Sequence, residues 1–293
     1  MKKIVTFAVI LVLALTLSAC SGEAITPNEP YDMNDGIEMG EYKETAFTVA
    51  SYNIKGGDAT LGSVKGINEN IVNVGADIAG LQEVDHLSER SGKKDFLQIF
   101  REGVMNNVSY FPMMLKGFGE TYGIASVSKT PISRSHSFKL PYPYKYERSD
   151  VEKRIIMRSL VKIDGVQIAF YNTHLSYENV KMPNGQSLRQ AQIEYILELL
   201  ESDPCPYKIV VGDFNSLSFE EFDVLLKEGY NIVNNNDNRL DTYRGDDAEF
   251  LAIDNVVYSE SLELIESGKN DSDCSDHNML YATFKTVMRA ENI

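Results

Sequence analysis

Runs of apolar and β-branched residues alternate with helix-like segments along most of the chain. Buried strands show apolar runs or period-two alternation, whereas amphipathic helices repeat apolar positions every three or four residues. By these criteria the predicted strands are residues 47–54, 77–81, 110–115, 123–128, 132–140, 155–163, 166–172, 207–211, 253–258, 262–267 and 279–284. The predicted helices are residues 63–74, 93–105, 187–200 and 219–227.

Two local signals support this division. Asp164-Gly165 separates two strand-like runs and is a strong signal for a tight β-hairpin turn. Segment 187–200 carries its apolar residues on one helical stripe, and Pro204 follows its end. Because hairpins are mixed with helical crossovers, the pattern predicts stacked sheets flanked by helices instead of a single parallel sheet.

The first 20 residues have the pattern of a targeting signal. Lys2 and Lys3 precede an apolar run over residues 4–17, which is shorter than the about 20 residues that a membrane-spanning helix needs. The run closes in Leu17-Ser18-Ala19-Cys20, which resembles a bacterial lipobox with Cys20 as the lipidated residue. An ordinary secretory signal with a chance cysteine is the alternative. We therefore expect a secreted protein, lipid-anchored on the extracellular face of the bacterial membrane.

The rest of the chain divides into a linker and one domain. Residues 21–45 are polar, include Pro27 and Pro30, and lack periodicity, so we expect a flexible stalk. Residues 46–293 are enough for one large α/β domain with a substantial core. Beyond Cys20 the chain has only Cys205 and Cys274, so at most one disulfide is possible and a disulfide scaffold is excluded.

The charge balance restricts the partners. The chain has 43 acidic and 28 basic residues, a net charge of −15, and removing Lys2 and Lys3 with the signal leaves −17. A strongly acidic surface repels polyanions unless a local basic patch or a bound metal compensates. This composition disfavours a dedicated high-affinity DNA-binding protein but allows a nuclease with few contacts.

Short polar motifs stand at the ends of apolar runs in the last third of the chain. They are Gly212-Asp213-Phe214-Asn215, Ile253-Asp254-Asn255 and Ser275-Asp276-His277. They place carboxylates, amides and an imidazole at strand tips. This set suits a divalent cation acting on a phosphate ester, because hard cations such as Mg²⁺ take oxygen ligands and leave positions for water and substrate. A neighbouring Asp–His pair can move the proton that such a hydrolysis transfers.

Three further residues end strands earlier in the chain: Asn53, Glu83 and His174. Taken singly, Asn53 fits a turn, Glu83 a solvated acidic loop and His174 a structural or exposed site. Taken in order with the later motifs, they resemble the endonuclease/exonuclease/phosphatase superfamily. This superfamily includes DNase I-like nucleases, abasic-site endonucleases, bacterial sphingomyelinases and inositol polyphosphate 5-phosphatases.

The resemblance spans about residues 46–286. The matching strings are Ser-Tyr-Asn-Ile at 51–54, Leu-Gln-Glu-Val at 81–84, Thr-His-Leu at 173–175, Gly-Asp-Phe-Asn at 212–215, Ile-Asp-Asn-Val-Val-Tyr-Ser at 253–259 and Ser-Asp-His at 275–277. Smaller similarities to bacterial members are Arg90-Ser91-Gly92, Tyr122-Gly123, Arg154, Arg189 and Asp241-Thr242. The resemblance implies a four-layer α/β sandwich, with two packed mixed β-sheets flanked by helices and the site at one edge.

The resemblance also implies a metal site. Glu83 would be the main ligand, supported by Asn53 and Asp276. The expected ion is Mg²⁺, with Mn²⁺ or Ca²⁺ as alternatives. Asn215 would hold the phosphate or a metal, and His174 would stabilise charge on the phosphoryl oxygens.

The remaining roles concern the attacking water. Asp213 would orient or deprotonate it, and His277 would act as general base or as a donor to the phosphoryl oxygen. Asp254 would accept a hydrogen bond from His277 and fix its tautomer. The sequence shows no nucleophilic Ser or Cys arrangement, so direct attack by water is the simpler mechanism.

Several residues keep two interpretations. Tyr122, Arg154 and Arg189 either contact substrate or pack and pair at the surface. The Tyr-rich segment 141–146 is either a recognition loop or a rigid, Pro-fixed connection.

The sequence therefore predicts a surface-anchored, Mg²⁺-dependent, monomeric phosphoesterase. Its substrate class stays open among a nucleic acid, a phospholipid head group and a small phosphate ester, with phosphodiesters favoured. A catalytically silent binding protein on the same fold is the alternative from another class, although Glu83, Asp213 and His277 are all present.

Overall fold

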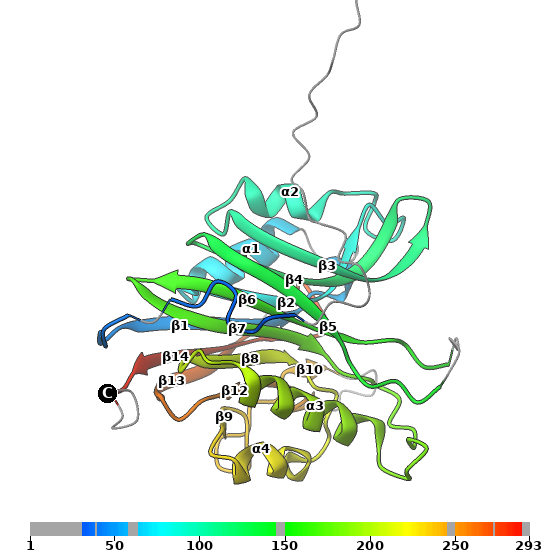
Figure 1. The fold of residues 1–293 in the computed structure, drawn as a ribbon. Helices are drawn as coiled ribbons and strands as arrows, with labels where there is room; N and C mark the ends of the chain where they lie inside the picture. The colour runs from blue at the N-terminus through cyan, green and yellow to red at the C-terminus, as the bar shows by residue number, and fades with distance from the viewer. Residues whose placement is uncertain are drawn as a thin grey trace, which may run out of the picture. The chain divides into compact units, whose positions relative to one another are not determined.

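Two six-stranded mixed sheets form the centre of the fold (Figure 1). The computed structural model describes residues 31–38, 40–57, 64–144, 150–244, 250–271 and 273–288. The chain divides into Met1–Asp32 and Met33–Ile293, and both sheets belong to the second unit. The expected signal, Cys20 and the first part of the expected stalk lie outside the described residues, as do residues 145 and 146 of the Tyr-rich segment.

The first sheet has the strand order β13-β14-β1-β2-β4-β3. Its strands in that order are Leu262–Asn270, Met279–Thr286, Ala46–Asn53, Ile78–His86, Glu120–Ser128 and Asn107–Gly117. β1 and β2 are parallel, and the other neighbours are antiparallel. The sequence predicted all six of these strands, five of them with shorter bounds.

The second sheet has the order β5-β6-β7-β8-β12-β9. Its strands in that order are Ile132–Lys139, Ile155–Ile163, Val166–His174, Lys208–Asp213, Asp254–Tyr258 and Asn231–Ile232. Only β7 and β8 are parallel. The β6–β7 hairpin turns at Asp164 and Gly165, as the sequence predicted. A two-stranded ribbon of β10 (Tyr243–Arg244) and β11 (Phe250–Leu251) was not predicted.

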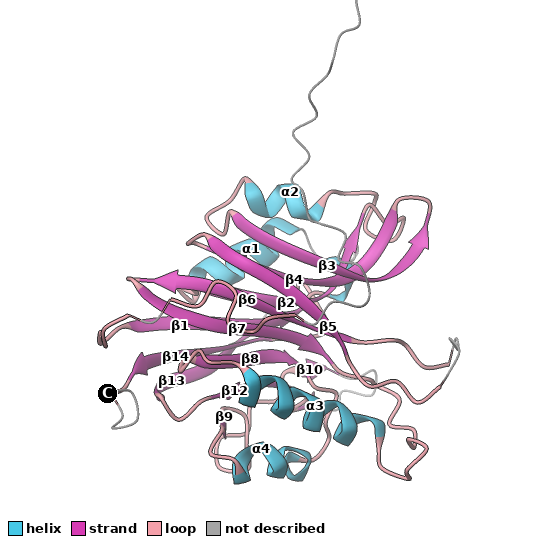
Figure 2. Ribbon diagram, in the orientation of Figure 1, coloured by secondary structure: helices cyan, strands magenta, loops and turns pink. Residues whose placement is uncertain are grey.

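Helices cover the outer faces of both sheets (Figure 2). They are α1 (Val64–Asn73), α2 (Phe96–Arg101), α3 (Leu188–Ser202) and α4 (Asp223–Lys227), with short 3-10 turns at Lys55–Gly57 and Phe219–Phe222. Ser187 caps the start of α3, because its hydroxyl accepts a hydrogen bond from the Gln190 N–H at 3.2 Å. The resulting helix–sheet–sheet–helix order confirms the predicted four-layer α/β sandwich.

Alternate side chains of each strand supply separate cores. On β1, Phe47 and Val49 pack between the sheets with Ile168, Phe170 and other apolar side chains of the second sheet. The intervening β1 residues, Ala50 and Tyr52, pack against α1 and α2 on the outer face. Burying both faces explains the nearly continuous apolar runs of these strands. Within the described residues, no helix has both the length and the apolar content needed to cross a bilayer.

The segment just before β1 lies against the domain. The Arg158 guanidinium donates to the Met33 carbonyl at 3.2 Å, and the Gln167 side chain donates to the Gly36 carbonyl at 2.8 Å. The Tyr42 hydroxyl donates to the Thr286 carbonyl at 3.2 Å. The described residues from 33 onward therefore differ from the flexible stalk expected up to residue 45. Polar composition does not reveal that backbone groups are bound by side chains distant in sequence.

The two cysteines of the domain and the tyrosines at its β5–β6 connection are also placed. Cys205 and Cys274 do not form a disulfide with each other. Tyr142 and Tyr144 contact each other edge to face at 5.7 Å. The Tyr142 hydroxyl also donates to the Val151 carbonyl at 3.3 Å, which ties the described part of the Tyr-rich segment to the chain beyond it.

Candidate active site

The register of the second sheet brings three polar strand ends together. His174 at the end of β7 pairs with Asp213 at the end of β8, and Asp254 at the start of β12 pairs with Asp213 from the other side. Asn53, the last residue of β1 in the first sheet, donates from Nδ2 to Asp213 Oδ2 at 3.0 Å. Asp213 is therefore the point at which both sheets contribute to the site.

The end of β8 and the turn after it have a backbone that few residues allow. A Cβ at Gly212 would lie 2.3 Å from the Thr173 carbonyl oxygen, so only glycine lets β7 and β8 approach so closely. Asn215 adopts a φ of 49°, and its N–H donates to Asp213 Oδ1 at 2.9 Å. Its Nδ2 donates to the Leu175 carbonyl at 3.1 Å. The Gly-Asp-Phe-Asn motif thus fixes the orientation of the Asp213 carboxylate.

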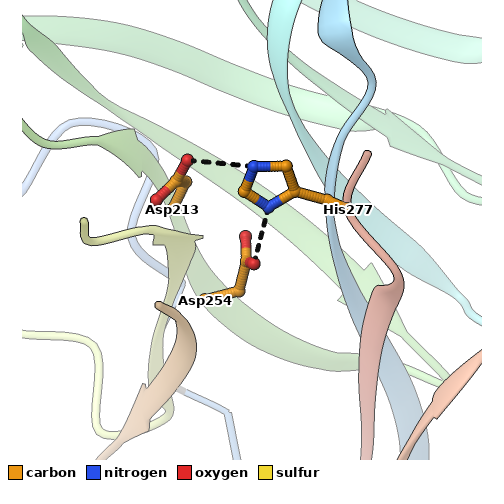
Figure 3. Close-up of side chains that lie close together, drawn as sticks. All are labelled: Asp213, Asp254 and His277. Carbon is orange, nitrogen blue, oxygen red and sulfur yellow. Dashed lines mark hydrogen bonds and ion pairs between the residues drawn. The ribbon is translucent and has the colours of Figure 1, made fainter. Parts of the chain in front are cut away.

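His277 lies between two carboxylates (Figure 3). Its Nδ1 is 2.8 Å from Asp254 Oδ2, and its Nε2 is 3.7 Å from Asp213 Oδ2. The Thr242 hydroxyl donates to the same Asp254 oxygen at 2.6 Å. Because a carboxylate accepts, Nδ1 of His277 carries the proton and Nε2 faces Asp213. The predicted Asp254–His277 pair is present.

Burial and charge perturb this group. Burial, together with the neighbouring Asp254 carboxylate, raises the pKa of Asp213 to about 7. Burial alone would lower the pKa of His277, but Asp254, their hydrogen bond and Asp213 raise it to about 9. Asp213 and His277 therefore each hold a proton more tightly than an ordinary aspartate or histidine does. Such perturbed neighbours are suited to proton transfer.

His174 has the opposite environment. Its Nδ1 lies 3.1 Å from Arg154 Nη1, and its Nε2 lies 3.5 Å from Asp213 Oδ2. A guanidinium has no acceptor, so Nδ1 must accept and the proton must be on Nε2. Burial, the Arg154 charge and His277 lower the pKa of His174 well below its usual value. His174 is therefore a neutral donor that points toward Asp213.

A β-bulge in β2 sets the position of the Glu83 side chain. β2 advances from Leu81 to Val84 while β4 moves only from Ala125 to Gly123, so β2 carries one extra residue there. Glu83 adopts a φ of 54° inside the bulge. Its Oε1 accepts from Asn53 Nδ2 at 3.2 Å. Asn53 thus joins the Glu83 and Asp213 carboxylates.

Asp276 lies on the loop before β14. Its neighbour Ser275 donates to the Asn53 carbonyl at 2.7 Å, which fixes this loop to the end of β1. Lys55 Nζ is 2.8 Å from Asp276 Oδ2, and this contact raises the pKa of Lys55. The Lys55 N–H also donates to Asn53 Oδ1 at 3.1 Å. Lys55 therefore contacts two of the three residues predicted to hold a metal, and no sequence motif had indicated it.

Two sets of residues offer ligand atoms for a divalent cation. Glu83 and Asp276 open onto the pocket and provide carboxylate oxygens, which suit Mg²⁺. Asp213, Asp254 and His277 also have ligand atoms within 4.8 Å of one another. Asp254 Oδ1 is buried and has no hydrogen-bond partner among the described residues, so it has a lone pair to offer. However, both His277 nitrogens already face carboxylates, which favours a proton relay there and the metal at Glu83 and Asp276.

Most of the candidate residues line a pocket of about 420 Å³. They are Glu83, Tyr122, Arg154, His174, Arg189, Asp213, Asn215, Asp276 and His277. Asn53 and Asp254 are buried behind this surface. The guanidinium of Arg189 contacts both carboxylate oxygens of Glu221, at 3.0 and 3.1 Å. Arg189 therefore has a packing partner as well as a place on the pocket wall.

Sequence reasoning missed several residues at this site. Arg90 and Thr242 belong to strings that were noted only as smaller similarities. Lys116 lies at the end of β3 without any motif around it, and Lys55 simply follows Ser-Tyr-Asn-Ile. Only the fold shows that Arg90 and Lys116 line the pocket, that Lys55 contacts Asp276 and that Thr242 contacts Asp254.

Comparisons with known proteins agree with this architecture. The model of the Endonuclease/Exonuclease/phosphatase family matches residues 50–277. An endonuclease/exonuclease/phosphatase from Beutenbergia cavernae is 14% identical, with a TM-score of 0.67 over 83% of this chain and 72% of that one. A family protein from Bacteroides thetaiotaomicron is 18% identical, with a TM-score of 0.61 over 84% of this chain and 100% of that one.

A third solved structure has a named activity. The mannosyl-6-phosphatase of Bacteroides thetaiotaomicron is 19% identical, with a TM-score of 0.57 over 81% of this chain and 99% of that one. At these identities the similarity concerns the fold. No curated protein matches the chain.

Proposed function

This chain belongs to the endonuclease/exonuclease/phosphatase family, and we propose that it is a divalent-metal-dependent phosphoesterase that hydrolyses its substrate by direct attack of water. The observation that carries this proposal is the Asp254–His277–Asp213 cluster, which adjoins the Asn53–Glu83 pair. It combines perturbed proton-transfer groups with oxygen ligands in one pocket.

The residues divide the work of hydrolysis. Asp213 accepts a proton from the attacking water, and its raised pKa makes it a stronger base than an ordinary aspartate. His277 donates from Nε2 to the phosphoryl or leaving oxygen. Asp254 holds the imidazole of His277 in this orientation by accepting a hydrogen bond from Nδ1. His174 donates its fixed Nε2 proton to a phosphoryl oxygen. Glu83 and Asp276 would hold the cation, which when bound neutralises charge on the phosphate.

The substrate is proposed as a phosphodiester, with nucleic acids and phospholipid head groups as the two classes to separate. The acidic chain favours a small or lipid diester, whereas secretion favours a scavenging nuclease. The test is to incubate the full chain with plasmid DNA or a phospholipid phosphodiester, in Mg²⁺ or in EDTA. If product forms from only one of the two substrates, in Mg²⁺ and not in EDTA, that substrate identifies the substrate class.

Two variants make this test decisive. Asp213→Ala is expected to abolish turnover, whereas Asp237→Ala, which removes an exposed loop carboxylate, is expected to keep it. Turnover that persists in Asp213→Ala would contradict the mechanism. Binding of a phosphate ester without any turnover by the wild type would support the silent binding protein instead.

Location at the extracellular face of the membrane is part of the proposal. It is supported by the apolar run over residues 4–17 and the Leu-Ser-Ala-Cys ending at Cys20. Cys20→Ala is expected to move the protein from the membrane fraction to the soluble fraction. Unchanged membrane association of this variant would reject the lipid anchor.

A further inference from the structure

A buried carboxylate anchors two bases beside the site. Asp85 on β2 has no exposed surface. It accepts from the Ser88 hydroxyl at 2.7 Å and from Arg90 through Nε and through Nη2 at 3.2 Å. Lys116 Nζ forms an ion pair with its Oδ1 at 3.3 Å. Arg90 follows β2 in the chain and Lys116 lies on β3, so the fold brings them together.

The ring of Tyr122 gives both bases a second contact. Lys116 Nζ lies 4.4 Å from the centre of this ring, and the Arg90 guanidinium carbon lies 5.6 Å from it. Burial raises the pKa of Tyr122, so the ring bears no charge of its own. We call Arg90, Lys116 and Tyr122 the basic wall, and all three line the pocket that contains Glu83 and Asp213.

Charge is distributed unevenly among the described residues of the pocket. Arg154 pairs with Glu152 at 3.0 Å, and Arg189 pairs with Glu221 at 3.0 Å, so each of these bases has its own carboxylate. On the basic wall, Arg90 and Lys116 share Asp85. A guanidinium and an ammonium together carry more donors than one carboxylate accepts. Arg90 also faces Glu83, so the basic wall has an excess of positive charge when Glu83 holds a cation.

The basic wall also adjoins Glu83, the principal candidate metal ligand. Arg90 Nη2 is 3.2 Å from Asp85 Oδ1 and 3.8 Å from Glu83 Oε2, so its guanidinium reaches from the wall to the principal candidate metal ligand. A cation held by Glu83 would neutralise that carboxylate and leave the excess on the wall available. An anion bound there would lie next to the scissile phosphate.

We propose that the basic wall binds a second phosphate group of the substrate, next to the ester that is hydrolysed. This inference rests on the proposed function and narrows its substrate to molecules with at least two phosphates. Arg90 contacts Asp85 through Nε and Nη2, so it offers a phosphate its remaining guanidinium donors, and Lys116 supplies a point charge. A second pocket of about 420 Å³ lies at the opposite ends of β7 and β8, near Val166 and Tyr207, and holds none of the candidate catalytic residues.

The test is calorimetric titration of the full chain in excess Mg²⁺. The probes are short alkyl diphosphonates and the alkyl monophosphonates of the same length, whose carbon–phosphorus bonds are not hydrolysed. The wild type is expected to bind the diphosphonate about tenfold more tightly, the usual scale for a charge-assisted contact. Deoxythymidine 3′,5′-bisphosphate and inositol 1,4-bisphosphate then distinguish a nucleotide source from a phospholipid head-group source.

Three variants decide the result. Lys116→Met is expected to reduce the diphosphonate preference about tenfold, whereas Lys116→Arg keeps the charge and the preference. Lys162→Met removes a lysine paired with Glu38, remote from the site, and should behave like the wild type. An unchanged preference in folded Lys116→Met overturns the basic wall. Hydrolysis of a test ester without any diphosphonate preference overturns it too and leaves the proposed function intact.

Discussion

Arg154 fixes the proton of His174. Arg154 Nη1 lies 3.1 Å from His174 Nδ1, and both side chains are buried. Since arginine only donates, His174 accepts at Nδ1 and carries its proton at Nε2, facing Asp213 at 3.5 Å. His277 has the reverse arrangement, because the Asp254 carboxylate accepts a hydrogen bond from its Nδ1. The Asp213 carboxylate thus faces the neutral imidazole of His174 and the charged imidazole of His277.

Replacing Arg154 should release the tautomer of His174. In Arg154→Met we expect Nδ1 to lose its donor, so nitrogen NMR should show both tautomers where the wild type shows only the Nε2–H form. Turnover should fall by about 10²-fold, as for the loss of one preorganised donor. Arg134→Met breaks a partly exposed pair with Asp35, outside the pocket, and serves as the control. A single unchanged tautomer in Arg154→Met would reject this role.

The metal prediction concerns Glu83. Mg²⁺ should raise the melting temperature of the wild type, because a ligand that binds only the folded state stabilises it. In Glu83→Gln this increase should be lost, and in Glu89→Gln, which changes an 80% exposed side chain nearby, it should remain. If Asp254→Asn loses the increase and Glu83→Gln keeps it, the cation binds within the Asp213–Asp254–His277 cluster instead.

The stability of the metal-free protein should fall as pH rises. Asp213 has a folded pKa of about 7 against an ordinary value near 3.9, so the folded state binds more protons between these pH values. His277, with a folded pKa of about 9, stabilises the protein fully below about 6.5 and loses that contribution as pH rises through 9. We expect the unfolding free energy in EDTA to drop by a few kcal/mol from pH 4 to 9.

The matched variant isolates this effect. Asp213→Asn cannot titrate at this position, so its stability curve in EDTA should be flatter between pH 4 and 7. Urea unfolding measured across this pH range checks both chains. A wild-type curve that rises with pH through this window would contradict the raised pKa of Asp213.

A buried ion pair supports the second sheet far from the catalytic residues. Arg158 on β6 donates to Asp203 at 2.7 and 2.9 Å, and both side chains are buried. Arg158→Met leaves Asp203 without its counter-charge, so we expect a loss of about 3–5 kcal/mol in unfolding free energy. Arg134→Met removes a partly exposed pair with Asp35 and should cost less than about 1 kcal/mol. Urea unfolding measures both, and equal losses would contradict the prediction.

Several features of the fold were predictable from local pattern. Apolar runs located the strands, and the Asp164-Gly165 turn located the β6–β7 hairpin. The helix at 187–200 corresponds to Leu188–Ser202, because a capping serine and a following proline mark its ends in the sequence. The polar residues at strand ends, such as Asp213 and His174, were evident for the same reason, since a change from apolar to polar residues marks where a strand emerges.

The sequence by itself thus determined most of the elements and the chemical groups at their tips. Only the tertiary structure decided which tips meet, because periodicity defines the faces of a strand but not its neighbours. The β7–β8–β12 register places His174 and Asp254 on either side of Asp213. The bulge at Glu83 and the approach of Lys116 to Asp85 depend on pairing between strands. These are contacts between residues distant in the chain, and no local signal encodes them.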